Sequence, residues 1–150
     1  MDSRHPALKA ALVPIGAMLG SQVLISLAVL SLSVLMPAVA RDLEIAPKLV
    51  GAFAAVIYVV ASVVALGSAA WISRLGAVRV CQLAMIAAAA GLALNAAATV
   101  AATIAAVTLI GIAQGPINPA SAHILTQRVP RAWFSLVFSV KQTGVPLGFA

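Results

Sequence analysis

The chain has 150 residues, of which 63% are hydrophobic and 8% are charged. Soluble domains carry about a quarter charged residues, so this composition excludes an ordinary soluble globule, and the large apolar fraction excludes a disordered chain. The single cysteine excludes an intramolecular disulfide scaffold, and a polytopic membrane protein is the class that remains.

The formal net charge of +6 does not indicate a nucleic-acid-binding protein. A nucleic-acid interface gathers its basic residues on one surface, whereas here they occur singly or in loose pairs between long uncharged stretches. Such spacing is typical of the loops between membrane spans. We therefore expect membrane lipid, and no nucleic acid, among the partners.

The uncharged stretches predict the membrane spans in chain order. Residues 10–40 and 49–73 contain no charged side chain, and neither does the 48-residue stretch 80–127. At about 1.5 Å per residue, that last stretch would form a helix of roughly 72 Å. The hydrocarbon core is only about 30 Å thick, so the chain must fold back once, around 95–103. Five spans are expected, over about 12–39, 50–72, 80–97, 102–125 and 134–150.

These spans are expected to be helices, because membrane strands would be about ten residues long with strict alternation of apolar and polar side chains. No segment alternates in this way. The predicted fold is therefore an all-α, polytopic transmembrane helical bundle. The fifth span reaches Ala150 without a polar flank, and a helix ending in hydrocarbon leaves its last carbonyls unsatisfied. We therefore expect the chain to be a fragment of a longer protein.

The first span has a second interpretation as a secretory signal peptide. Arg4, His5 and Lys9 form a basic lead, and Ala38-Val39-Ala40 resembles a small-x-small cleavage site. The apolar run between them is about twice the 7–15 residues of a signal core, which favours a retained first helix.

The distribution of charge predicts the orientation of the bundle. If the N-terminus is cytoplasmic, the inside segments hold six Lys or Arg, whereas the outside segment holds only Arg41 and Lys48, beside Asp42 and Glu44. Cytoplasmic loops carry the excess of basic residues in multi-pass proteins. We therefore expect the N-terminus to face the cytoplasm.

A short basic turn joins the second and third spans. Arg74 and Arg79 lie on either side of Gly76. Glycine allows the chain to reverse within a few residues, and the basic side chains can hold helix C-termini and anionic headgroups. An ordinary loop that obeys the positive-inside rule would have the same composition.

Polar side chains within the spans are the candidate solute-binding residues. Gln114, Asn118 and Ser121 follow one another at i, i+4 and i+7 and so share one face of the fourth span, while Gln22 and Ser26 lie in the first. Polar groups at membrane depth usually face the bundle interior or a cavity. They either line a solute pathway or only hydrogen-bond neighbouring helices together.

The start of the fifth span carries a lysine inside an apolar segment. Lys141 and Gln142 lie seven to eight residues past Phe134, so about 10 Å into the membrane. At the core centre a lysine costs about 2.5–3.5 kcal/mol. Lys141 either extends back to the interface or faces a cavity and attracts an anionic solute. In the same segment Gly144 and Gly148 allow close approach of a neighbouring helix, and a proline permits a bend.

These segments resemble transporters of the major facilitator superfamily. Arg74 and Gly76 match the family's turn between spans two and three, and the Gln-Gly pair at 114–115 matches its motif in span four. The run Lys-Gln-Thr-Gly-Val-Pro-Leu-Gly at 141–148 resembles the start of span five in bacterial members. The resemblance covers about residues 23–150.

The resemblance implies a twelve-helix fold, of which residues 1–150 form part of the N-terminal six-helix half. It also implies a solute held near the membrane midplane while two halves rock to alternate access. A role in this conformational change falls on the turn and on the fifth span, through Arg74, Gly76, Arg79, Gly144, Pro146 and Gly148.

The expected function is secondary transport of a small organic solute, with an anion favoured by the lysine, across the inner (cytoplasmic) membrane. The substrate-binding candidates are Gln22, Gln114, Asn118, Lys141 and Gln142. The implied partners are the solute, a coupling ion and the C-terminal half of the same protein, without which the fragment is not expected to transport. A small membrane scaffold without solute transport, and a membrane-embedded enzyme whose catalytic residues lie beyond 150, remain as alternatives.

No constellation of residues in the sequence supports catalysis. It contains no carboxylate pair at catalytic spacing, no metal-ligand cluster, no nucleophile with a base and no phosphate-binding loop. We therefore expect no enzyme activity, no metal and no cofactor. His123 is expected near the cytoplasmic interface, and Cys81 is expected to be a small packing residue.

Overall fold

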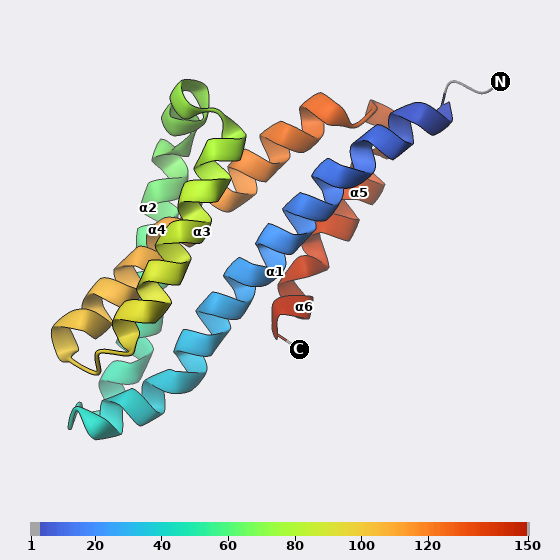
Figure 1. Ribbon diagram of the computed structural model, residues 1–150. Helices are drawn as coiled ribbons and strands as arrows, with labels where there is room; N and C mark the ends of the chain where they lie inside the picture. Colours follow the sequence, from blue (N-terminus) through green and yellow to red (C-terminus); the bar gives the residue numbers. More distant parts are fainter. Residues whose placement is uncertain (1–3, 150) are drawn as a thin grey trace.

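The computed structural model describes residues 4–149, and within them the regular structure is entirely helical. The predicted all-α bundle is confirmed (Figure 1). The α-helices are α1 (Arg4–Asp42), α2 (Val50–Leu75), α3 (Ala77–Asn95), α4 (Val100–Arg128), α5 (Phe134–Gln142) and α6 (Gly144–Phe149). Two short 3₁₀ turns, Pro47–Leu49 and Arg131–Trp133, precede α2 and α5.

Four of these helices are long and apolar enough to cross a membrane, which makes the chain a multi-pass membrane protein. They are Val13–Asp42 of α1 and the whole of α2, α3 and α4. The shortest, α3, has 19 residues and is about 28 Å long, close to the hydrocarbon thickness. Large apolar side chains face outward along the bundle, as for Leu66 with 87% of its surface exposed, because the surrounding solvent is lipid rather than water.

The fifth predicted span differs from a single helix. Two short helices, α5 and α6, follow one another with only Thr143 between them, and the backbone of Thr143 keeps helical angles (φ −64°, ψ −16°). Pro146 lies in the first turn of α6, where the N–H that proline lacks would have no partner inside the helix. The backbone N–H of Leu147 then donates to the carbonyl of Thr143 at 3.1 Å and starts the second helix.

Helix α4 lies at the centre of the bundle. It pairs with α3 through the turn at 96–99, packs against α2 on another side and also contacts α1, while α6 lies along α1 (Figure 1). Half of the apolar window of α4 is buried inside the bundle, compared with 11% for α2. Helix α4 is therefore the surface on which α1, α2 and α3 assemble, while α6 packs on α1.

Two glycines allow the contact between α4 and α2. A Cβ atom at Gly111 would lie 2.8 Å from the Cβ of Val60, and one at Gly115 would lie 2.6 Å from the carbonyl oxygen of Ala61. No side chain fits at such distances, so glycine at both positions brings the two backbones together. The sequence analysis assigned no role to Gly111, and the structure gives it this packing role.

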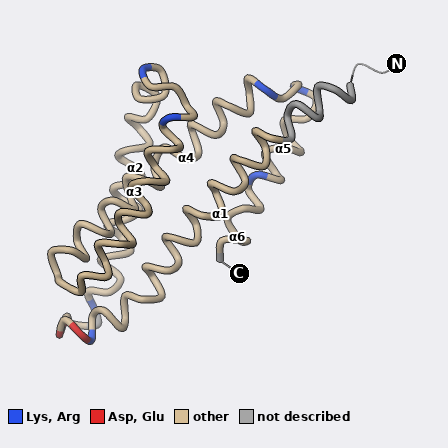
Figure 2. Tube along the Cα trace, viewed as in Figure 1, with Lys and Arg blue, Asp and Glu red and all other residues tan. Residues whose placement is uncertain are grey.

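The charged residues divide between the two ends of the bundle (Figure 2). Among the side chains that the structure describes, Arg74, Arg79, Arg128 and Arg131 lie at one end; Arg41, Lys48, Asp42 and Glu44 lie at the other. One end is thus basic and the other is balanced, the asymmetry from which the orientation was predicted. Among the described residues, Lys141 of α5 is a basic residue that lies away from both ends.

Candidate functional site

Lys141 is buried inside the bundle, with 3% of its surface exposed. Its Nζ donates a hydrogen bond to Oδ1 of Asn118 on α4 and a long one, 3.5 Å, to Oε1 of Gln142. Asn118 lies ten residues before Arg128, so about 15 Å along α4 from its basic end. The ammonium therefore lies well below the basic end of the bundle and is not extended to the interface, although both of its acceptors are exposed residues.

Among the described residues, the ammonium of Lys141 has neutral partners only. Within the part of the chain that the structure describes, the carboxylates are Asp42 and Glu44, and both lie at one end of the bundle, away from α5 (Figure 2). The amide oxygens of Asn118 and Gln142 satisfy hydrogen bonds but leave the positive charge uncompensated. A buried cation normally has an opposite charge beside it, so this position favours an anion.

Helix α1 reaches the same site through a close contact with α6. A Cβ at Gly144 would lie 3.0 Å from the Cβ of Gln22, and one at Gly148 would lie 2.6 Å from the Cβ of Ser26. Lys141, Gly144 and Gly148 are all buried and follow one another at i, i+3 and i+7, so they share one face. The glycine pair thus brings Gln22 of α1 against the helix face that continues from Lys141.

Two glutamine oxygens near this face have no hydrogen-bond partner. Gln22 is 1% exposed and its Oε1 is buried without a donor. Gln114 lies one turn from Asn118 on α4, and its Oε1 is also buried and unpartnered. No direct hydrogen bond joins Gln114 or Gln22 to Lys141 among the described side chains, so these glutamines lie beside the Lys141–Asn118–Gln142 cluster rather than within it. We call the five residues together the polar cluster.

Ser121 does not share the role of the other polar residues on its helix face. Its hydroxyl donates to the carbonyl oxygens of Ile117 at 2.6 Å and Asn118 at 3.1 Å, both in its own helix. This local bonding satisfies the hydroxyl without a solute. Ser26 likewise serves as a packing surface, for Gly148.

The basic turn between α2 and α3 lies apart from the polar cluster. Gly76 alone connects the two helices, and its φ of +82° and ψ of 144° lie in a region that other residues rarely adopt. Its N–H donates to the carbonyl of Ile72 at 3.0 Å and closes the end of α2. Arg74 and Arg79 are exposed on either side of it.

The remaining sequence candidates have local surroundings. His123 is exposed near the end of α4 and hydrogen-bonds Gln127 at 2.9 Å. Cys81 is buried within the main apolar core cluster. Asn95 and Thr103, which the sequence analysis considered only as the bounds of a turn, are both buried with an unpartnered side-chain oxygen. No sequence pattern marks them, because burial at a helix end depends on the neighbouring helices.

The geometry defines the class of protein: a multi-pass α-helical membrane protein with a buried lysine that has no carboxylate partner among the described residues. Comparisons of the chain with protein-family models, with curated proteins and with solved structures give no match.

Proposed function

We propose that this chain is the N-terminal part of a secondary transporter similar to the major facilitator superfamily, and that the polar cluster binds a small organic anion. The observation that carries the proposal is the buried ammonium of Lys141, which has only neutral acceptors. The chain lies in the inner (cytoplasmic) membrane with its N-terminus in the cytoplasm. The basic end of the bundle supports this orientation.

Lys141 can bind an anion without giving up its present partners. An ammonium group has three N–H donors, and Asn118 and Gln142 accept two of them. The third is left for a carboxylate or similar group. Attraction between opposite charges is many times stronger inside a bundle than in water, so an anion entering the site gains more than it would at the surface.

Pro146 supports a moving role for this segment. Proline lacks the N–H that would donate to the carbonyl of Gln142 one turn earlier, so the helix is weakened beside the two cluster residues Lys141 and Gln142. The segment can therefore change its angle close to the bound anion.

The proposal is tested by binding to the purified protein in detergent micelles. Benzoate and its uncharged analogue benzamide are the probes, and the shift in unfolding temperature is the measurement. We expect benzoate alone to stabilise the protein. Lys141→Arg should retain the effect and Lys141→Gln should lose it, while Lys48→Gln, which removes an exposed lysine at the opposite end, should leave it unchanged. Equal stabilisation of the Lys141→Gln variant would contradict the proposal.

A membrane scaffold without solute transport is the second candidate function. The close contacts at Gly111, Gly115, Gly144 and Gly148 favour it, because such contacts bind helices together whether or not a solute is present. In that case Lys141→Met should raise the unfolding temperature, since it removes a buried charge, and no anion should stabilise the starting protein.

A further inference from the structure

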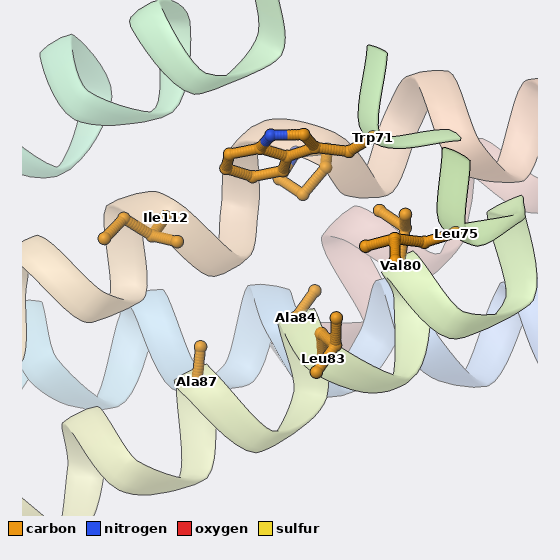
Figure 3. Close-up of a pocket in the computed structure, with 8 residues that line it drawn as sticks. Trp71, Leu75, Val80, Leu83, Ala84, Ala87 and Ile112 are labelled. Atoms are coloured by element: carbon orange, nitrogen blue, oxygen red, sulfur yellow. The ribbon is translucent and has the colours of Figure 1, made fainter. Parts of the chain in front are cut away.

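A cavity lies between α2, α3 and α4, and no residue of the polar cluster lines it (Figure 3). Its volume is about 240 Å³, and every side chain that lines it is apolar or aromatic. The lining includes Trp71 and Leu75 of α2, Val80, Ala84 and Ala87 of α3, and Ile112 of α4. A wholly apolar space on a membrane bundle offers water no hydrogen bonds but matches an acyl chain.

The basic turn lies at one end of this cavity. Leu75 and Val80, which line the cavity, directly neighbour Arg74 and Arg79 in sequence, and Gly76 joins the two helices between them. Both arginines are exposed, and the described carboxylates lie at the opposite end of the bundle. The turn therefore presents two positive charges, free of nearby negative charge, beside an apolar cavity.

An apolar cavity beside two positive charges matches the acyl chains and the headgroup of an anionic phospholipid. An anionic phospholipid carries its phosphate at the membrane interface and its acyl chains in the hydrocarbon below. Basic residues at the cytoplasmic interface attract such headgroups, and tryptophan is frequent at this depth. Trp71 lies between the arginine turn and the deeper lining residues Ala87 and Ile112 in the close-up view (Figure 3).

We propose that an anionic phospholipid of the surrounding bilayer binds at this place, with an acyl chain in the Trp71 cavity and its phosphate between Arg74 and Arg79. A zwitterionic lipid also offers a phosphate, but its headgroup carries a cation that two arginines repel, so the cavity favours lipids of net negative charge. The site is independent of the polar cluster and does not depend on the transport proposal.

Trp71 provides a direct reporter of this site. The chain has two tryptophans, so Trp133→Phe leaves Trp71 as the only one. The protein is reconstituted with phosphatidylglycerol or phosphatidylcholine whose acyl chains are brominated, because bromine quenches tryptophan fluorescence on contact. We expect the anionic lipid to compete for the site about thirtyfold better than the zwitterionic one, as two arginines at the interface predict.

Two variants separate the parts of the proposal. The double variant Arg74→Gln/Arg79→Gln should make the two brominated lipids quench equally, and Ala87→Phe should fill the cavity and reduce quenching by both. The matched controls are Arg41→Gln, at the opposite end, and Ala89→Phe, on the exposed face of α3; neither should change the preference. Circular dichroism confirms equal helix content.

Two results would overturn the proposal. Equal quenching by both lipids in the starting protein would show that the arginines select no headgroup. Absence of quenching by either lipid would show that another protein segment, rather than lipid, covers the cavity.

Discussion

Replacing Gly115 by alanine tests whether the contact between α2 and α4 holds the bundle together. The added Cβ would lie 2.6 Å from the carbonyl oxygen of Ala61 and 2.9 Å from the Cβ of Val64. Ordinary van der Waals contact begins near 3.4 Å, so the helices must separate by about 0.8 Å, the difference between 3.4 and 2.6 Å. A backbone carbonyl cannot withdraw alone, and the whole contact must shift.

The expected cost follows from two opposing effects. Overpacking of this kind costs about 1–3 kcal/mol, and a gap of 0.5–1 Å forfeits about a quarter to a half of the dispersion energy of the atoms concerned. Replacing glycine by alanine inside a helix stabilises the helix by about 0.5–1 kcal/mol. We therefore expect Gly115→Ala to lower the free energy of unfolding by about 2 kcal/mol.

The control is Gly67→Ala, on α2, where an added Cβ would meet no atom within 4 Å. This variant has only the helix-propensity gain and should be slightly more stable than the starting protein. Both are measured by unfolding in mixed micelles with increasing sodium dodecyl sulfate, followed by circular dichroism. If Gly115→Ala unfolds at the same detergent fraction as Gly67→Ala, the close α2–α4 contact does not stabilise the fold.

Three further substitutions probe other parts of the bundle by the same unfolding assay. Gly76→Ala should cost about 1–3 kcal/mol because of its φ of +82°, although the added Cβ has open space; an unchanged stability would mean that the turn relaxes freely. Thr99→Ala should cost about 1 kcal/mol, because the hydroxyl of Thr99 accepts the N–H of Ala102 at 3.2 Å and caps α4, while Thr99→Ser should retain the cap. Asn118→Leu should cost about 2 kcal/mol by leaving the ammonium of Lys141 without its acceptor, and adding Lys141→Met should restore most of that loss; strictly additive costs would show that the two side chains do not interact.

The sequence predicts the helices because the membrane sets a single length scale. Residues 80–127 are too long for one span and too apolar for a loop, and the structure has α3 ending at Asn95 and α4 beginning at Val100. The break at Thr143 was not predicted in position. Pro146 signalled a bend, but a proline in the first turn of a helix and one in its interior look the same in sequence.

The packing of the helices depends on contacts between segments that are far apart in the sequence, and no single segment identifies its partner. Gly144 and Gly148 have the small-xxx-small spacing of a helix contact, but nothing in their own segment identifies Gln22 and Ser26 as the opposite surface. Gly111 has the same spacing to Gly115, and nothing in that segment identifies α2 as the helix that approaches it. The spacing of small residues indicates that another helix packs closely against this one. Only the fold identifies which helix that is.

The orientation of the Lys141 side chain could not be predicted from the sequence either. Its position in the sequence fits both an ammonium extended toward the interface and one extended inward, because the flexible stem reaches about as far in either direction. Asn118 decides between them by supplying an acceptor on the neighbouring helix. Without that acceptor the interior position would leave the ammonium with only the long bond to Gln142, and the cost of burying a charge would favour the interface. The amide oxygens of Asn118 and Gln142 therefore hold the ammonium in place by hydrogen bonds but do not neutralise its positive charge. In the proposed transporter, a bound anion supplies the missing negative charge.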